Sequence, residues 1–289
     1  MNTSRLGLAL MHLLAKLPLP VLRGIGWGVG RLLFILAAPR RKIALRNLEL
    51  CFPEVPAAQR RAWAKETFVV FCQTFIDRSW LWFGSEALVR SRVQLTGALH
   101  ELEGDTATIV FAPHFYSMDA GGLALPLNTP REFTSIFATN PDPVLDAWFM
   151  AGRQRFGKVR MLNRADGVKP IIANLRQGGL LYLLPDMDFG PNESIFVPFY
   201  GVKTATVPSL SRFARLGRAK VIGMYTRLTP TGYVAEITPA WEGYPSDDVE
   251  ADTAQMNLRL QSYIDTMPGQ YYWVHKRFKT RPAGEPSVY

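Results

Sequence analysis

The sequence predicts an α/β protein whose central sheet, largely parallel or mixed, is flanked by helices and preceded by a membrane-associating helical segment. From about residue 93, short apolar runs alternate with helical stretches, as in proteins built on a mainly parallel sheet. The runs are continuously apolar, which strands covered on both faces require. Residues 1–50 combine apolar residues with eight Lys and Arg residues and one acid, Glu49, within a chain of net charge +9.

Length and composition limit the organisation. The 289 residues allow one large domain or two small ones. The simplest division is a basic apolar segment over residues 1–40 and one catalytic domain over residues 41–289. Charged residues make up 20% of the chain, too many for a polytopic membrane protein. Two cysteines without a CxxC pair and four scattered histidines leave few ligands for zinc, so we expect no metal.

The N-terminal segment is typical of a chain that lies at an anionic membrane surface, because it is basic, apolar and contains Trp27. A membrane-spanning helix needs about 20 apolar residues, whereas Lys16, Arg23 and Arg31 interrupt this stretch. We favour a monotopic or half-inserted anchor over a full span; an ordinary amphipathic helix packed on the domain is the alternative. The glycines of GIGWGVG (residues 24–30) follow no strand, so we expect them to permit close packing.

Residues 57–83 predict one long helix, since they contain no Pro or Gly and lie between Pro56 and Gly84. The second half is almost wholly apolar and aromatic. Burial in the core is the favoured interpretation, and contact with lipid or with an acyl chain in a tunnel is the alternative.

The rest of the chain is expected to alternate strands and helices. Strands are predicted at VQLTG, ATIVFAP, FTSIFAT, VRML, GLLYLLP, AKVIGMYTRL and YVAEITP, and helices at residues 118–125, 143–156, 167–177, 207–216 and 251–267.

The first candidate site is APHFYSMDAGG, where His114 and Asp119 follow an apolar strand that ends at Pro113. On one continuous helix, residues five apart point about 140° apart, so the two side chains can meet only across a strand-to-helix turn. Ligands of open α/β sheets bind at this carboxyl end of the strands. A carboxylate beside an imidazole makes a general base. A structural histidine satisfied by a nearby aspartate is an equally common reading of this spacing.

Other charged residues also follow predicted strands or lie close to helix ends. Arg153 is near the end of a helix, Arg164 follows a strand, Asp186 and Asp188 follow another, and Lys203 precedes the expected start of a helix, a position suited to anions. Each alone could be a solvated or turn residue. No G-x-S-x-G elbow or phosphate-binding loop is present. Direct attack by a substrate hydroxyl on an activated acyl group therefore fits best.

The ordered motifs resemble the late acyltransferases of lipid A biosynthesis, the lauroyl/myristoyl transferase family within the H-x4-D/E glycerolipid acyltransferase superfamily. The resemblance covers nearly everything from residue 40 onward. It is carried by RKIALRNLELCFPE, APHFYSMDAG, GRQRFG, LPDMDFGP, FVPFYGV, ATVPSLSRFARLGRAKV and PGQYYWVHKRFKTRPAGEPSVY. One departure is Phe137-Ala138, where many relatives carry an arginine after the aromatic residue.

The resemblance implies a glycerolipid acyltransferase-like fold and an enzyme at the cytoplasmic face of the inner membrane. Such enzymes use acyl carrier protein as donor, need no cofactor, and acylate a hydroxyl on an acyl chain of a Kdo-bearing lipid A precursor. His114 would be the general base, Asp119 its orienting partner and Arg153 the group that stabilises the oxyanion or binds phosphate. Arg164, Asp186 and Asp188 match motif positions.

The positive charge suits two anionic partners, the lipid precursor and the acidic carrier protein, as well as the membrane surface. The basic tail from His275 to Arg281 could add to this surface or be merely solvated. Nucleic acid is not expected, because the basic residues are embedded in an apolar segment. Two other hypotheses are O-acylation of a lysophospholipid or aminolipid, and a non-catalytic lipid-binding protein.

Overall fold

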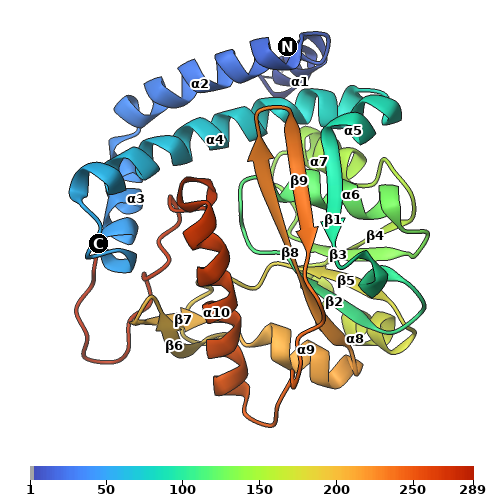
Figure 1. Cartoon of the computed structure of the whole chain (residues 1–289), viewed down its shortest axis with the longest axis vertical. Coiled ribbons are helices and arrows are strands. Elements are labelled where there is room, and N and C mark those ends of the chain that lie inside the picture. The colour runs from blue at the N-terminus through green and yellow to red at the C-terminus, as the bar shows by residue number, and fades with distance from the viewer. Residues whose placement is uncertain (1–2) are drawn as a thin grey trace.

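The computed structural model describes residues 3–289, within which a seven-stranded sheet has the order β1-β9-β8-β2-β5-β3-β4 (Figure 1). Strands β8, β2, β5, β3 and β4 are parallel, β9 is antiparallel to β8, and β1 is parallel to β9. The predicted, largely parallel α/β sheet is therefore confirmed. The strands are β1 (Val93–Gly97), β2 (Thr108–Phe111), β3 (Phe133–Phe137), β4 (Val159–Asn163), β5 (Leu180–Leu183), β8 (Lys220–Thr229) and β9 (Gly232–Ile237).

Helices cover both faces of this sheet, and each face has its own apolar core. Val110 and Tyr182 pack with α6 (Met118–Asn128) and α7 (Pro143–Arg153). Their neighbours Ile109 and Leu181 pack on the other side with α8 (Lys169–Arg176), α9 (Ser209–Gly217) and α10 (Val249–Thr266). Adjacent strand residues point to opposite faces, which is why the central strands are apolar throughout.

Helix α4 (Ala57–Phe83) has the bounds that the sequence predicts, and it lies along one end of the sheet (Figure 1). Its last turns are buried, with Trp80, Leu81 and Trp82 almost fully covered. Burial in the core, the favoured interpretation, is therefore confirmed for these turns, whereas Phe71 and Phe75 of the same apolar half are exposed. Ser85 then caps the short helix α5 (Glu86–Arg92) by accepting a hydrogen bond from the Leu88 amide.

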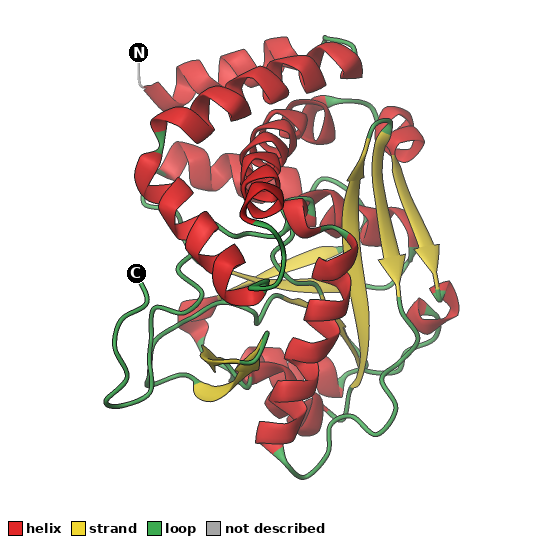
Figure 2. Cartoon of the chain, turned by 60° about the vertical axis from the view of Figure 1, so that its left-hand side comes forward, coloured by secondary structure: helices red, strands yellow, loops and turns green. Residues whose placement is uncertain are grey.

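The N-terminal segment forms α1 (Thr3–Leu14), α2 (Leu19–Leu36) and α3 (Ala38–Cys51), and α2 lies along α4 (Figures 1 and 2). Two glycines of GIGWGVG make this approach close. A Cβ on Gly26 would lie 2.7 Å from Gln73 Cγ, and one on Gly30 would lie 2.5 Å from Val69 Cα. Their expected role in close packing is confirmed. The expected segment boundary at residue 40 falls inside α3.

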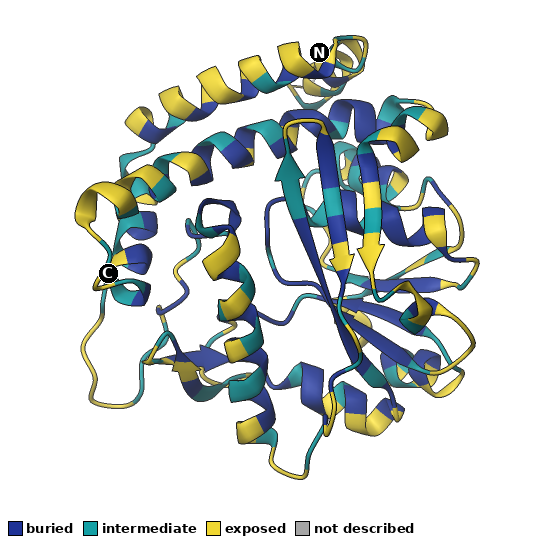
Figure 3. Cartoon of the chain, viewed as in Figure 1, coloured by how far each residue is buried: buried dark blue, intermediate teal, exposed yellow. Residues whose placement is uncertain are grey.

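The opposite side of α1 and α2 is apolar and exposed (Figure 3). We call this surface the apolar face; it consists of Leu6, Leu10, Leu13, Val21, Ile25, Trp27, Val29, Leu32, Ile35 and Leu36. Helix α2 is long and apolar enough to cross a membrane by length and composition alone. In this structure, however, one side of α2 packs against α4. Arg23 points inward and pairs with Asp77, with 3.0 Å between Nη2 and Oδ2.

The glycine contacts give a prediction with a matched control. Gly30→Val should lower the free energy of unfolding by about 1–3 kcal/mol, because its side chain must displace the α4 backbone. Gly28→Val is the matched control, because it places the same side chain on the same helix. A Cβ on Gly28 would have no heavy atom of residues 3–289 within 4 Å, its own helix backbone and chain neighbours aside. Denaturant unfolding in detergent measures both, and equal losses would contradict the packing argument.

A short hairpin, β6 (Ile195–Phe199) and β7 (Val202–Thr206), is absent from the sequence-based expectations. Its two-residue loop, Tyr200-Gly201, has positive φ at both positions, the geometry of a type I′ turn. The interpretation of Lys203 as a residue just before a helix is wrong, since Lys203 lies within β7 and α9 begins at Ser209.

The basic C-terminal tail is folded onto the protein, with Lys276 and Lys279 exposed. Arg277 is buried, and its guanidinium donates to the carbonyl of Ala205 at 2.7 Å and to the hydroxyl of Thr206 at 2.8 Å. Asn47 of α3 donates its side-chain amide to the carbonyls of Trp273 and His275, each at 2.7 Å. The tail thus joins the hairpin to the N-terminal helices.

Candidate active site

The carboxyl ends of the neighbouring strands β2 and β5 bring His114 and Asp186 together. Each strand is followed by a proline, Pro113 or Pro185, and then by the functional side chain. His114 Nδ1 lies 2.7 Å from Asp186 Oδ1, and the His114 backbone amide donates to Asp186 Oδ2 at 2.9 Å. The sequence predicted Asp119 as the partner of His114; in the structure this imidazole nitrogen is hydrogen-bonded to Asp186 instead.

Asp186 is fully buried and accepts a further hydrogen bond from the Tyr271 hydroxyl at 3.0 Å. Burial opposes its ionisation, but the charge and hydrogen bonds of His114 and the charge of Arg277 outweigh burial and lower the pKa of Asp186. An ionised carboxylate at Nδ1 favours the tautomer with a proton on that nitrogen. The lone pair of Nε2 is then available to accept a proton from a substrate.

Asp119, in the first turn of α6, is held by two arginines. Arg78 of α4 donates to Asp119 Oδ2 through Nε at 2.8 Å and Nη2 at 2.6 Å, and Arg153 Nε donates to Oδ1 at 3.2 Å. Burial alone would raise the pKa of Asp119, yet the two guanidiniums lower it to about 2. In this structure Asp119 therefore orients Arg153 rather than the imidazole.

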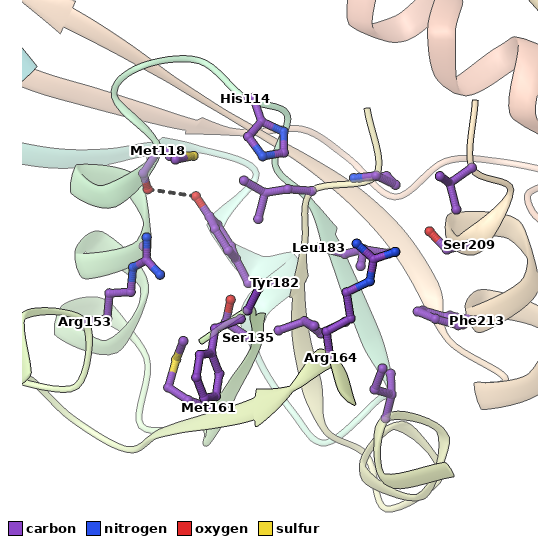
Figure 4. A pocket seen from close by; sticks show the side chains of 18 of the residues that line it. His114, Met118, Ser135, Arg153, Met161, Arg164, Tyr182, Leu183, Ser209 and Phe213 are labelled. Atoms are coloured by element: carbon purple, nitrogen blue, oxygen red, sulfur yellow. Dashed lines mark hydrogen bonds between the residues drawn. The ribbon is translucent and has the colours of Figure 1, made fainter. Parts of the chain in front are cut away.

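His114, Asp119 and Arg153 border a cavity of about 520 Å³ at the carboxyl edge of the sheet (Figure 4). This volume is within the range of small-molecule sites. The lining includes the imidazole of His114 and the charged side chains of Asp119, Arg153, Arg164 and Glu193. The remaining walls are mainly apolar and include Phe137-Ala138, the departure from the family pattern. No residue of 57–83 lines this cavity, and contact of this helix with an acyl chain stays a prediction.

Three other residues were predicted to bind substrate, Arg164, Asp188 and Lys203, and only Arg164 lines the cavity. Arg164 lines the cavity, pairs with Glu193 at 2.7 Å and covers the Phe189 ring. Asp188 does not line it, because its carboxylate accepts from Gly190 and from both the amide and hydroxyl of Thr280, which fixes the tail. Lys203 is exposed on β7, outside the cavity lining.

Two residues of the site were not singled out from the sequence, Arg78 and Tyr271. The signal for Arg78 is a charge inside the apolar half of a long helix, where a cation needs a partner. Tyr271 carries no comparable signal, since its hydroxyl meets Asp186 only through the fold of the tail.

The tail also gives a pH prediction at His275. Burial, followed by the charge of Arg277, lowers the pKa of His275 to about 4, and its Nε2 accepts from the Asp188 amide at 3.3 Å. An unfolded histidine has a pKa of about 6.5. The folded state thus binds fewer protons, and this contribution to stability is present above pH about 6.5 and is lost as the pH falls toward 4.

We therefore expect His275→Gln to reduce the acid sensitivity of the fold. Between pH 7 and 4, the unfolding free energy of the wild type should fall by about 2–3 kcal/mol more than that of the variant. Urea titrations at several pH values measure this difference, and parallel profiles would contradict it.

An α/β fold that places an imidazole–carboxylate pair and an arginine held by a carboxylate beside a mainly apolar cavity is suited to acyl transfer. Residues 2–280 match the model of the bacterial lipid A biosynthesis acyltransferases, and the chain belongs to this family.

Named relatives agree over nearly the full length. The lipid A biosynthesis lauroyltransferase of Escherichia coli K12 is 32% identical over 290 residues, which cover 98% of this chain and 94% of that protein. The myristoyltransferase of the same organism is 31% identical, with 93% and 83% covered. A lipid A biosynthesis acyltransferase of Haemophilus influenzae is 33% identical, with 97% and 88% covered.

Proposed function

We propose that this acyltransferase moves a fatty acyl chain from acyl carrier protein to a hydroxyl of a Kdo-bearing lipid A precursor, forming a secondary, acyloxyacyl ester. The observation that carries the proposal is the His114–Asp186 pair, which leaves Nε2 of His114 available beside an apolar cavity. Relatives named as lauroyl-, myristoyl- and palmitoleoyltransferases support a fatty acyl group as the cargo. The reaction needs no cofactor.

In the proposed reaction, Nε2 of His114 removes the proton of the acceptor hydroxyl while its oxygen attacks the thioester carbonyl. The carbonyl oxygen becomes an oxyanion, which the Arg153 guanidinium stabilises. Collapse of the tetrahedral intermediate forms the ester and breaks the carbon–sulfur bond. The imidazolium returns its proton to the departing thiolate, so the free thiol of the carrier leaves and the enzyme is regenerated.

The same proposal includes a membrane location, at the cytoplasmic face of the inner membrane. The apolar face on α1 and α2 gathers many exposed apolar side chains on two helices, and exposed apolar surfaces mark membrane or protein contacts. Because α2 is packed on α4, contact through one side of these helices suits a monotopic attachment. Basic residues at the start of α3 add attraction for anionic lipids.

A reconstituted assay tests the reaction. Purified full-length protein with acyl carrier protein thioesters should acylate a Kdo-bearing lipid A precursor in mixed micelles, detected by mass spectrometry. Lysophospholipid, offered under the same conditions, should remain unacylated. Transfer to lysophospholipid alone would instead favour the alternative acceptor class, and transfer to neither lipid would contradict both. Lipid A from a deletion strain should lack one secondary acyl chain.

A further inference from the structure

Residues from both faces of strands β5 and β3 line the cavity, and we describe the part lined by each face as one lobe. Paired residues of adjacent strands share a face of the sheet. Ser135 pairs with both Met161 and Tyr182, which places these three on one face. Ile136 pairs with Leu162, whose core cluster includes Leu183, and so faces the other side. Both sets border the cavity through Ser135, Met161 and Tyr182 on one side and Ile136 and Leu183 on the other.

We name these lobes after the helices that cover them. The α6 lobe is lined by Gly122, Leu123, Phe133, Ser135, Met161 and Tyr182. The α9 lobe is lined by Ile136, Val168, Ile171, Leu183 and Phe213. No residue that lines the α6 lobe is exposed, whereas Val168 on the α9 side is 45% exposed.

Two consecutive glycines of α6 have opposite surroundings. A Cβ on Gly121 would lie 2.2 Å from Thr226 Oγ1, so this glycine allows the helix to pack on β8. A Cβ on Gly122 would meet no heavy atom within 4 Å among residues 3–289, apart from its chain neighbours and its own helix backbone. The missing side chain of Gly122 thus leaves open space in the α6 lobe.

The open space at Gly122 belongs to the same cavity as His114 and Arg153. Gly122 lies three residues after Asp119, on the same side of α6, and Asp119 holds Arg153. In Figure 4, His114 lies at one end of the cavity and Met161 and Ser135 at the other, with Tyr182 between them. An acyl carbonyl placed between His114 and Arg153 would direct its chain past Gly122 toward Met161.

We propose that the α6 lobe binds the transferred acyl chain of the donor, and that Gly122 and Met161 set the chain length that the enzyme accepts. This inference rests on the proposed use of an acyl thioester donor. A straight saturated chain suits the lobe, because its walls are mainly apolar, with Ser135 as the small polar exception, and its one tyrosine hydroxyl donates to the Met118 carbonyl at 2.9 Å. A side chain at position 122 would occupy volume that methylene groups otherwise fill.

The test compares Gly122→Met, Gly122→Ala and Met161→Ala in purified full-length protein with a series of even-numbered saturated acyl carrier protein thioesters. Gly122→Met should move the preferred donor to a shorter chain by about two to four carbon atoms, since its side chain has about four heavy atoms. Its kcat/KM for the wild-type donor should fall at least about tenfold relative to a shorter donor. Gly122→Ala should show a smaller shift, and Met161→Ala should shift the preference toward longer chains.

Retained turnover of the short donor shows that Gly122→Met is folded, so a loss on long donors alone is a specificity effect. An unchanged chain-length profile in Gly122→Met and Met161→Ala would overturn the inference while leaving the proposed reaction intact. A higher KM for the acceptor with unchanged donor preference would assign the lobe to the acceptor and also overturn it. If the wild type transfers no acyl group from any carrier thioester, the proposed function fails instead.

Discussion

Asp186→Asn should lower kcat by about three to four orders of magnitude while the protein remains folded. The amide has nearly the same shape, but it carries no charge to hold the Nδ1 proton of His114 or to stabilise the imidazolium that forms during the reaction. His114→Ala should cost at least as much, because it removes the base itself. The measurement is single-turnover acyl transfer by each purified variant, with the fold checked by circular dichroism.

The double variant provides the control for this assignment. If His114 and Asp186 act as one unit, the double variant should lose no more activity than His114→Ala alone. Losses that multiply would mean that Asp186 acts separately from the imidazole. Activity near the wild-type level in Asp186→Asn would contradict the pairing at 2.7 Å as the arrangement used in catalysis.

Asp119→Ala should lower the free energy of unfolding by about 3–5 kcal/mol, because it leaves the guanidinium of Arg78 buried without a counter-charge. The side chain of Arg78 is 11% exposed, whereas that of Arg153 is 33% exposed and can turn to solvent. Activity should fall as well, since Arg153 loses the carboxylate that fixes its position. Urea unfolding and steady-state kinetics measure the two effects.

Removing the buried charges together separates these effects. Arg78→Met combined with Asp119→Leu should recover most of the stability, because apolar residues of similar size replace the ion pair, but the activity should stay low. The pKa of Asp119, about 2 in the folded state, lies below its unfolded value, so ionised Asp119 stabilises the fold above pH about 4. The cost of Asp119→Asn should therefore shrink as the pH falls from 4 toward 2, and a constant cost would contradict the ion pair.

Much of the fold could be predicted from local sequence patterns. The bounds of α4 follow from Pro56, Gly84 and the lack of breakers between them, and the parallel core strands follow from their continuous apolar runs. The β6–β7 hairpin was missed because its turn residues, Tyr200-Gly201, are not the Asn-Gly pair that usually indicates such a turn.

The sequence could locate the candidate site, but it could not predict which residues of the site pair with one another. His114, Asp119 and Arg153 do border one cavity, as their positions at a strand end and helix ends indicate. Their partners depend on contacts distant in sequence: Asp186 lies 72 residues from His114, and Arg78 lies 41 residues from Asp119. Spacing within a short motif carries no information about such contacts, so a nearby carboxylate was assigned to the imidazole.

The C-terminal tail has a consequence for the order in which the working enzyme forms during translation. Helices α1 and α2, with their apolar face, leave the ribosome before Tyr271 and Thr280, which anchor Asp186 and Asp188. The contact between Tyr271 and Asp186 can therefore form only after the N-terminal helices have been synthesised. Domains fold as their residues emerge, so the support behind His114 is among the last parts of the fold to assemble.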